Sequence, residues 1–520
     1  MLGIAAHHPL RPDCPPGIPN SLLFDARRLA RPAALLAIFG LAGLALRLFG
    51  ITGSLWLDEF GTLWTVEGSL RQVFQRSLAF HGQSPLYYLI TWLAVRLFGE
   101  SEVVLRLPAL LFGILTAAAV YKLGREVGGT QTGLLSAGLV WLCFRQVEES
   151  ANARPYTMAT FLVAVMLLGF LRAAGDGRAS SRLLFIAGGV GLLYSHYLYT
   201  LPAAGVAAAY FTARELRKRY SPGRFACDAA AQILLALPCL PQLRSLLERS
   251  GGLSWLGAPD YFALVTVAGP LLALAVAGMA GRRLTWAESL APQWRLLWMA
   301  AAAPALFLLG LALGGTNLLE ARYLLSLTVP ASVLAARGIL ALPAAHGILA
   351  GLCWVSWNLF YFAACFYLSG SFSGAGRQQW RQALSHLEGL IPPGQAVPVL
   401  YRSGFVEEDR RPQGPVSEAT LAPLRSPGRQ PPAWILVPLT YRWRRLPLRE
   451  QYFDRTVTPA IEGAQVFYLL SCENGPVDYP DRLEEWVEKR YPGRFHRERL
   501  RAARGIVLIH FRARTPQAPP

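Results

Sequence analysis

Cysteine and charge are both scarce in this sequence. The seven cysteines show neither CxxC nor Cys/His metal spacing, and four or five of them lie in apolar runs, so neither a disulfide framework nor a zinc site is indicated. Charged residues make up only 16% of the chain, whereas 53% is hydrophobic. The net charge of +18 comes from arginines spread over short loops and a tail. Without an aromatic-interleaved basic face, this charge indicates topology signals and lipid head-group contacts, not nucleic-acid binding.

The sequence also lacks the short motifs with which enzymes commonly bind nucleotides. It contains no GxxxxGKS/T loop, no GxGxxG after a strand and no DxD triplet. Such motifs hold nucleotide phosphates or a metal–nucleotide complex. A cytosolic enzyme that uses a nucleotide sugar is therefore disfavoured, and a sugar donor reached outside a membrane would have to be attached to a lipid.

Long apolar runs fill the chain from position 31 to 368, which is typical of a multi-pass membrane protein. No cleavable signal peptide is evident, because residues 1–30 are polar, broken by prolines and end in arginines. The first run is therefore expected to remain as a transmembrane helix. The candidate spans are 31–50, 105–123, 132–146, 157–172, 183–197, 199–213, 226–241, 261–280, 295–313, 323–338 and 345–368.

The charge of the loops predicts how these spans are arranged. Basic segments such as 25–32 and 121–126 are expected on the cytoplasmic side, so an even number of crossings must separate them. This holds if the apolar segment 84–99 is an interfacial helix. The result is about 11 spans under the positive-inside rule, with residues 1–30 as a cytoplasmic tail. The segments then predicted outside are 51–104, 147–156, 242–260 and 314–322, with the junction at 195–199.

The composition changes near position 370, where the span-length apolar runs end. Short β-type runs such as 396–401 and 505–511 alternate with helical stretches such as 481–490, which predicts a small α/β domain. By parity this domain lies outside. We expect a mainly α, polytopic membrane protein with juxtamembrane helices, in which 31–370 form the transmembrane domain and 371–520 an extracytoplasmic α/β domain.

The stretch SLWLDEFGTLW at 54–64 places Asp58 and Glu59 just beyond the first span. One explanation is structural: aspartate is a favoured N-cap and acids suit a helix N-terminus, so Asp58 could cap a helix that begins near Glu59. A cap needs only one acid, however, and here two follow a tryptophan. The alternative is that Asp58 accepts a proton from an acceptor hydroxyl while Glu59 orients a substrate.

Other ionisable and aromatic groups fall in the segments predicted outside. Arg154 could bind an anionic group bidentately, or could snorkel at the membrane surface while Pro155 starts a helix. His196 lies among tyrosines at a helix–helix turn, where a structural interfacial role is the simpler explanation. The remaining candidates, with interface-anchor or exposed-loop alternatives, are Tyr156, Glu320, Arg322, Tyr323 and His81.

The predicted topology brings Asp58, Glu59, Arg154, His196 and Arg322 to the same membrane face. Ionisable groups at such a boundary are candidates for function. Two acids with several cations suit a phosphate-ester substrate and a hydroxyl as second substrate. No metal-binding residues are indicated and no cofactor is certain, although the acids could bind a divalent cation without any spacing signature.

Several of these stretches resemble, in order, the membrane domain of the GT-C glycosyltransferases. They are WLDEFGTLW, the run that begins SPLYYLITWLAVRLFG, then ARPYTM, YSHYLY and EARYLLSLTVPASVLAARGI. The branch that looks most similar contains bacterial relatives of the dolichyl-phosphate-mannose-protein mannosyltransferases and the aminoarabinose transferases that modify lipid A. The resemblance covers about residues 31–370. It implies that Asp58 is the catalytic base, Glu59 its neighbour, 84–99 a juxtamembrane helix and Arg322 a partner of the donor phosphate.

Two departures accompany the resemblance. Relatives often carry a QEARPY-like string, whereas this chain reads SANARPY, so that Asn152 stands where an acid is expected. Relatives also tend to have His-Pro-Pro before the juxtamembrane helix, where this chain has HGQSP. The role of the second outer loop is therefore less firmly implied than that of the first.

The resulting hypothesis is an inverting glycosyltransferase that moves a sugar from a polyprenyl-phosphate donor to a hydroxyl of an extracytoplasmic lipid, glycan or protein. Its site and C-terminal domain would face outward from a bacterial inner membrane. Donor phosphate or substrate contacts are expected from Arg154, Tyr156, His196, Arg322, Tyr323, Glu320 and His81. One alternative is a transporter or flippase of lipid-linked glycans, which would bury charges at mid-membrane on repeated halves. A non-catalytic glycan-binding membrane scaffold is the other.

Overall fold

The computed structural model describes residues 26–78, 84–248, 259–280, 291–316, 318–369, 379–391, 397–402, 434–439, 458–472, 479–503 and 505–514. The chain divides into two compact units, Met1–Ala42 and Gly43–Pro520. Helix α1 (Ala26–Gly50) begins in the first unit and ends in the second. All further elements belong to the second unit.

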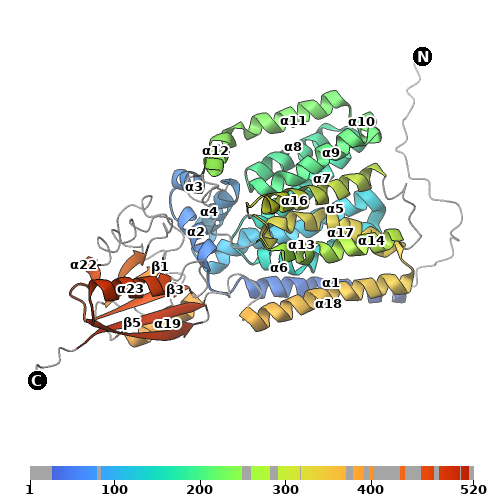
Figure 1. Cartoon of the computed structure of the whole chain (residues 1–520). Helices are drawn as coiled ribbons and strands as arrows, with labels where there is room; N and C mark the ends of the chain where they lie inside the picture. Colours follow the sequence, from blue (N-terminus) through green and yellow to red (C-terminus); the bar gives the residue numbers. More distant parts are fainter. Residues whose placement is uncertain are drawn as a thin grey trace, which may run out of the picture. The chain divides into compact units, whose positions relative to one another are not determined.

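Helices dominate the first two thirds of the second unit (Figure 1). In chain order they are α2 (Leu57–Val66), α3 (Leu70–Arg76), α4 (Leu86–Phe98), α5 (Glu102–Trp141), α6 (Phe144–Ser150), α7 (Tyr156–Asp176), α8 (Ala179–Leu193), η2 (Tyr197–Thr200), α9 (Leu201–Thr212), α10 (Arg214–Arg219), α11 (Pro222–Ala236), η3 (Leu237–Cys239), α12 (Leu240–Glu248), α13 (Tyr261–Val267), α14 (Gly269–Ala280), α16 (Pro292–Leu313), η5 (Ala321–Leu327), α17 (Thr328–Ala341) and α18 (Ala344–Ser369).

Helix α5 is a helical hairpin. Its backbone leaves the helical region at Gly129, where φ is 83°. A Cβ atom added to Gly133 would lie 2.7 Å from the carbonyl oxygen of Tyr121, although residues twelve apart on a straight helix are about 18 Å apart. The chain therefore reverses direction at Gly129. The two arms correspond to the predicted spans 105–123 and 132–146, except that the second arm ends at Trp141 and a separate helix, α6, follows.

Six helices in the described ranges are long and apolar enough to cross a membrane, and counting the bent pair α13–α14 as one span raises the number to seven. The predicted multi-pass character is therefore confirmed. The count of about 11 spans from the positive-inside rule stays a prediction. Helix α8, with 15 residues, is shorter than the roughly 20 residues that a crossing needs. The six helices are Glu102–Trp141, Tyr156–Asp176, Pro222–Arg244, Pro292–Leu313, Ala321–Ala341 and Ala344–Tyr367.

Helix α4 covers most of the segment predicted to lie at the interface. It has 13 residues, too few for a crossing. Its Trp92 Nε1 and Arg96 Nη2 both donate to the carbonyl oxygen of Gly68, at 2.9 and 3.0 Å. These bonds tie α4 to the turn between α2 and α3. Its length fits the juxtamembrane helix expected for 84–99.

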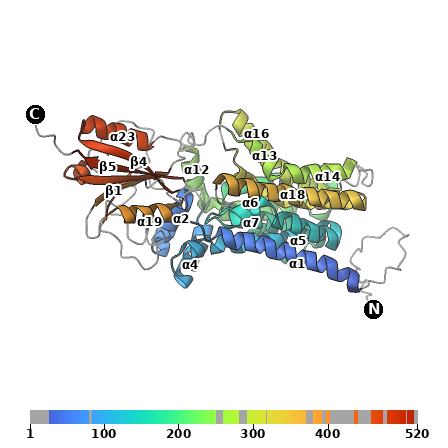
Figure 2. The ribbon, with the colours of Figure 1, turned by 90° about the horizontal axis from the view of Figure 1, so that it is seen from below.

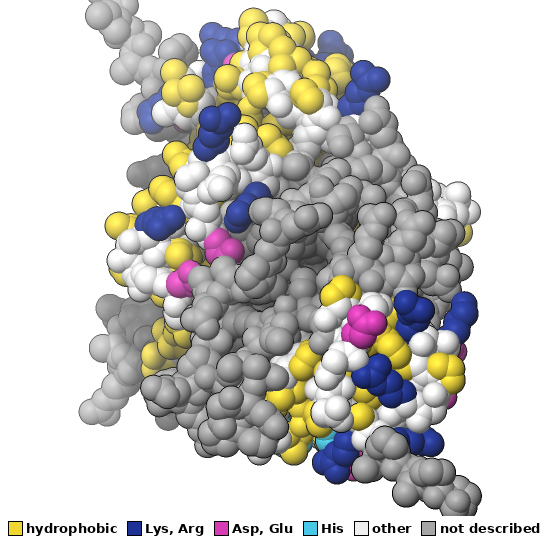
Figure 3. Space-filling view, turned by 90° about the vertical axis from the view of Figure 1, so that its left-hand side faces the viewer, with side chains coloured by type: hydrophobic (Ala, Val, Ile, Leu, Met, Phe, Trp, Pro, Cys, Tyr) yellow, Lys and Arg dark blue, Asp and Glu magenta, His cyan; other side chains and the backbone are white. Residues whose placement is uncertain are grey.

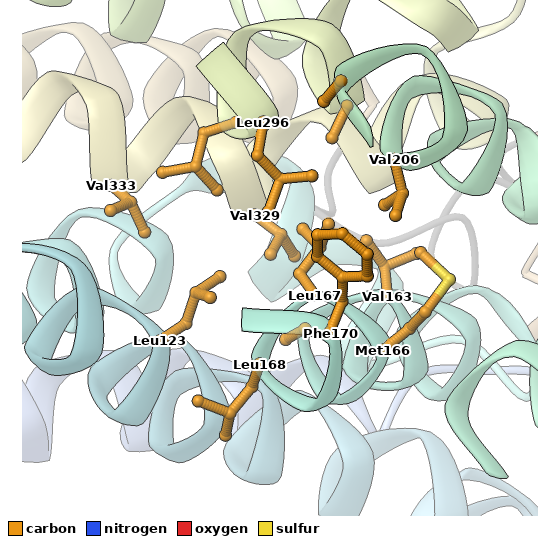
Figure 4. Close-up of a cluster of buried hydrophobic side chains, with 14 of the residues drawn as sticks. Leu123, Val163, Met166, Leu167, Leu168, Phe170, Val206, Leu296, Val329 and Val333 are labelled. Carbon is orange, nitrogen blue, oxygen red and sulfur yellow. The ribbon is translucent and has the colours of Figure 1, made fainter. Parts of the chain in front are cut away.

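The largest apolar core surrounds α7. Val163, Leu167 and Phe170 have no exposed surface, and Figure 4 shows them facing Leu123 of α5 and Leu296 of α16. Because α7 is apolar on all sides, it can be buried by neighbours in every direction. This packing fixes the position of α7, and with it the start of the helix, where the preceding loop carries Arg154.

Helices α7 and α8 cross at a pair of glycines. A Cβ atom added to Gly169 would lie 2.4 Å from the backbone nitrogen of Phe185, and one added to Gly188 would lie 2.7 Å from that of Met166. Real Cβ atoms do not approach backbone this closely. The absence of both side chains therefore sets the distance between the two helices.

A mixed five-stranded sheet forms the C-terminal part of the chain. Its strands are β1 (Val397–Arg402), β2 (Trp434–Leu439), β3 (Val466–Cys472), β4 (Phe495–Ala503) and β5 (Ile506–Ala513), in the order β2-β1-β3-β5-β4. Strand β1 is parallel to β2 and β3, and β5 is antiparallel to β3 and β4. The helices α19 (Trp380–Leu390), α22 (Thr458–Ile461) and α23 (Tyr479–Arg490) accompany it.

Side chains alternate between the two faces of this sheet. Phe467, Leu469 and Ile509 pack with Val487 of α23, whereas Tyr468 and Leu508 lie in the same cluster as Leu387 of α19. Figure 2 shows α23 and α19 on opposite sides of the strands. On the face shown in Figure 3, the described Lys and Arg side chains are dispersed among apolar and acidic ones. The predicted domain boundary at 370/371 and the outward placement of the domain remain predictions.

The glycine crossing leads to a stability prediction. Gly169→Ala is expected to destabilise the protein by about 1–3 kcal/mol, because the new methyl group overlaps the backbone of α8. Gly175 provides a matched control on the same helix, since nothing lies within 4 Å of its added Cβ. Thermal unfolding in detergent should show a lower Tm for Gly169→Ala and an equal or higher Tm for Gly175→Ala. Equal stability of the two variants would contradict the tight crossing.

Candidate active site

The loop between α1 and α2 is held by one arginine. Arg106 Nη1 donates to the carbonyl oxygens of Ile51 and Gly53, at 2.9 and 2.5 Å, and Nη2 donates to that of Ser54 at 3.1 Å. Its Nε and Nη2 also donate to the two carboxylate oxygens of Glu59, at 2.7 and 2.5 Å. All the N–H donors of the guanidinium are therefore used. Neither side chain of the pair has any exposed surface.

Glu59 completes this buried network from the other side. Its carboxylate also accepts from the backbone nitrogens of Ala153, at 2.7 Å, and Trp56, at 3.2 Å. Trp56 occupies the N-cap position of α2 and Glu59 reaches back to it from the third helical position, as in a capping box. The alternative in which Asp58 caps the helix is thus corrected. The Glu59 side chain has no exposed surface and cannot reach a substrate. In place of the predicted catalytic role, it positions the backbone at Trp56 and Ala153.

Asp58 lies next to this network but points elsewhere. Its Oδ2 accepts from Arg322 Nη1 at 2.9 Å, and the side chains are 25% and 17% exposed respectively. The carbonyl oxygen of Asp58 accepts from Arg154 Nη1 at 3.3 Å. Two arginines from distant parts of the chain therefore meet at Asp58, Arg322 at its carboxylate and Arg154 at its backbone carbonyl, as the predicted topology requires.

The loop before α7 is positioned by the same region. The backbone nitrogen of Ala153 donates to Glu59, and its carbonyl oxygen accepts from Thr62 Oγ1 at 2.8 Å. Pro155 is the N-cap residue of α7, which agrees with its expected role as a helix start signal. Arg154 is held between these two anchors and is only 6% exposed.

Four rings line the site beside the arginines. Tyr156, His196, Tyr199 and Tyr323 form a cluster with ring centroids 5.1 to 6.3 Å apart. The guanidinium of Arg154 lies 5.8 Å from the ring of Tyr156, and that of Arg322 lies 5.3 Å from the ring of Tyr323. Cation–π contacts of this kind hold guanidinium groups in place while leaving N–H groups for other partners.

His196 is buried in this cluster, with 6% of its surface exposed. Burial, together with the positive charges of Arg154 and Arg322, lowers the pKa of His196 to about 3. The imidazole is therefore neutral at physiological pH. Within the ranges that the structure describes, its Nδ1 is buried without a hydrogen-bond partner, so the ring is a neutral hydrogen-bonding group available to a ligand.

The remaining predicted residues have different positions. Glu320 is the N-cap of η5, and its carbonyl oxygen accepts from the backbone nitrogen of Tyr323 at 3.0 Å. This bond is made by the backbone of Glu320, so the role of its side chain stays a prediction. His81 lies outside the described residues.

The predicted site omitted three residues that the structure brings to this region. Arg106 is the only arginine inside the apolar run 105–123. An ionisable group within a membrane span is itself a candidate for a functional or structural role. Tyr199 joins the ring cluster, and its hydroxyl donates to the carbonyl oxygen of Arg322. Glu149 lies in α6 and accepts from Asn152 Nδ2 at 3.1 Å. Glu149 therefore places an acid next to Asn152, the position at which similar sequences have an acid.

This arrangement has the parts needed to bind an anion and activate a hydroxyl. Asp58 is an accessible carboxylate, and the Nε–H groups of Arg154 and Arg322 are buried without hydrogen-bond partners among the described residues. Unmet guanidinium donors suit phosphate oxygens. No group of three or more His, Cys, Asp or Glu suited to a metal ion occurs within the described ranges.

Comparisons with known proteins agree with the fold. The family model for dolichyl-phosphate-mannose-protein mannosyltransferases matches residues 82–241. ArnT from Cupriavidus metallidurans in the apo state superposes with a TM-score of 0.58 at 12% identity, over 92% of this chain and 98% of that one. The same protein bound to undecaprenyl phosphate gives a TM-score of 0.56 at 12% identity, with the same coverage.

An archaeal oligosaccharyltransferase has a similar fold. AglB from Archaeoglobus fulgidus, in complex with an inhibitory peptide and a dolichol-phosphate, gives a TM-score of 0.52 at 14% identity, over 94% of this chain and 74% of that one. No curated protein matches the sequence. The resemblance to GT-C membrane glycosyltransferases related to the protein mannosyltransferases and ArnT is thereby confirmed.

The buried network around Arg106 leads to a prediction that separates the two adjacent acids. Glu59→Ala is expected to destabilise the protein by about 3–5 kcal/mol, because it leaves the Arg106 charge buried without its partner. Asp58→Asn should have little effect on Tm, since this side chain is partly exposed. Thermal unfolding of both variants in the same detergent tests the difference. A Glu59→Ala protein as stable as the wild type would contradict the positioning role.

Proposed function

We propose that this protein is an inverting glycosyltransferase of the GT-C type. It transfers a sugar from a polyprenyl-phosphate donor to a hydroxyl of an extracytoplasmic lipid, glycan or protein. The observation that carries this proposal is the convergence of segments far apart in the chain at Asp58, whose partly exposed carboxylate pairs with Arg322 and whose backbone carbonyl accepts from Arg154. The proposed location is a bacterial inner membrane, with the site on the outer face.

In the proposed step, Asp58 accepts the proton of the acceptor hydroxyl. The acceptor oxygen forms a bond to the anomeric carbon, and the bond between that carbon and the phosphate oxygen breaks. The lipid phosphate leaves with the electron pair, and the attack from the opposite side inverts the anomeric carbon. General-base help of this kind typically contributes about 10²–10⁴-fold.

Arg322 and Arg154 are proposed to bind the phosphate through the N–H groups that have no partner in the described structure. Donors fixed in advance by cation–π contacts and backbone bonds lose little freedom when negative charge develops on the leaving group. Neutral His196 and the hydroxyls around it are proposed to contact the sugar or phosphate as uncharged hydrogen-bonding groups.

The comparisons support the donor class. One similar structure has undecaprenyl phosphate bound, and another has a dolichol-phosphate. Both ligands share a long isoprenoid chain and a phosphate. The family model that matches 82–241 describes enzymes whose named donor is also a lipid-phosphate sugar. A lipid-linked donor also agrees with the absence of nucleotide-binding motifs from the sequence.

Transfer from labelled polyprenyl-phosphate sugars in proteoliposomes tests the proposal. Asp58→Asn is expected to reduce the transfer rate by about 10²–10⁴-fold, because the base is lost. Glu126→Gln serves as the control, since Glu126 pairs with Arg172 at 3.0 Å on a surface away from these residues. Near wild-type transfer by folded Asp58→Asn protein would rule out the assignment. Movement of labelled lipid across the bilayer without transfer would favour a flippase.

Arg322→Gln is expected to raise the KM for the donor by about tenfold or more, since a charged hydrogen bond to phosphate contributes roughly 1.5–3 kcal/mol. The KM for the acceptor should change little. Initial rates measured at varied donor and fixed acceptor, and then the reverse, separate the two effects. An unchanged donor KM would argue against phosphate binding by Arg322.

A further inference from the structure

Glu149 is a buried acid that the proposed reaction does not use. Its residue is 7% exposed, and its carboxylate accepts one described hydrogen bond, from Asn152 Nδ2 at 3.1 Å. Its neighbour Glu148 is different, because it forms an ion pair with Arg145 at 2.7 Å. In the described part of the chain no ion pair neutralises Glu149, so its charge acts on whatever lies around it.

The groups that face Glu149 come from three elements. Glu148 and Arg145 lie on α6, Tyr199 lies on η2 and Arg322 lies on η5. Helix α6 is tied to the start of α17, directly after η5, because Gln146 Nε2 donates to Thr328 Oγ1 at 2.7 Å. Arg322, which pairs with Asp58, is one of the charges that act on the Glu149 carboxyl. An ionised Glu149 therefore adds a second negative charge within electrostatic range of the arginine proposed to bind phosphate.

Building on the proposed function, we infer that Glu149 is a positioning residue that controls donor binding through its protonation. When neutral, Glu149 leaves the positive charge around Arg322 at its full strength for the phosphate of the donor. When ionised, its negative charge weakens that attraction through space. Because the phosphodiester of a sugar donor keeps its single negative charge, the change in affinity comes from the protein.

The direction of the pH dependence follows from the environment of this carboxyl. Burial and the negative charge of Glu148 raise the pKa of Glu149 to about 7. The neutral form therefore prevails below pH 7, and the ionised form prevails above it. Donor affinity should be highest below pH 7 and should fall as the pH rises through 7. By reciprocity, a bound donor should raise the pKa of Glu149 further.

The test uses a ligand that does not titrate in this range. The probe is the methyl diester of a polyprenyl phosphate, and its Kd is measured for the full-length protein in nanodiscs at pH 6, 7 and 8. The wild type is expected to bind about tenfold more weakly at pH 8 than at pH 6. Glu149→Gln should bind with the same Kd at all three values, whereas the control Glu126→Gln should keep the wild-type profile.

Two further variants should move the midpoint in opposite directions. Asn152→Leu removes the amide that stabilises the ionised carboxylate, so the midpoint should shift to higher pH. Glu148→Gln removes a negative neighbour, so the midpoint should shift to lower pH. These shifts distinguish protonation of Glu149 from a structural effect, which would change the Kd equally at every pH.

The outcomes also separate this inference from the proposed function. Absence of probe binding to the wild type at every pH would overturn the donor class, and this inference with it. Binding that is independent of pH in the wild type, or equally dependent on pH in Glu149→Gln, would overturn the role of Glu149 while leaving the donor class intact.

Discussion

The buried ion pair between Arg106 and Glu59 holds the region on which the candidate site depends. A fully buried charge pair is tolerated only when its geometry and its remaining hydrogen bonds compensate for the lost hydration. Here Arg106 also binds three carbonyl oxygens of the loop before α2, and Glu59 also binds the backbone of Trp56 and Ala153. One network thus fixes both the loop that leads into α2, whose first turn carries Asp58, and the loop that carries Arg154.

The adjacent acids in the first turn of α2 make different contacts because successive residues on a helix point in different directions. Glu59 points inward to Arg106 and has no exposed surface. Asp58 points toward Arg322 and remains 25% exposed. A carboxylate that is to exchange a proton with a substrate must be accessible, whereas one that anchors backbone must not be. The network around Glu59 gives Asp58 a rigid support without blocking its side chain.

Asn152 shows that a missing acid in a motif does not mean that the site lacks an acid, because a residue nearby in space can supply one. The string SANARPY lacks the acid expected before the arginine, but the turn after α6 brings Glu149 within hydrogen-bond distance of the Asn152 amide. The three-residue spacing allows this contact because it corresponds to about one helical turn. Helical spacing would let Arg145 pair with either Glu148 or Glu149. The structure shows that it pairs with Glu148, and that Glu149 has no ion pair among the described residues.

Composition and periodicity by themselves determined that the chain is a multi-pass helical membrane protein with a C-terminal sheet, since long apolar runs and alternating strands are local patterns. Loop charges also predicted that Asp58, Arg154 and Arg322 share one face, and the structure brings them together. Only the tertiary structure decided which acid is buried and which residue caps α2. These features depend on contacts between residues far apart in sequence, such as Arg106 with Glu59 and Arg322 with Asp58, and such contacts follow from packing and not from local propensity.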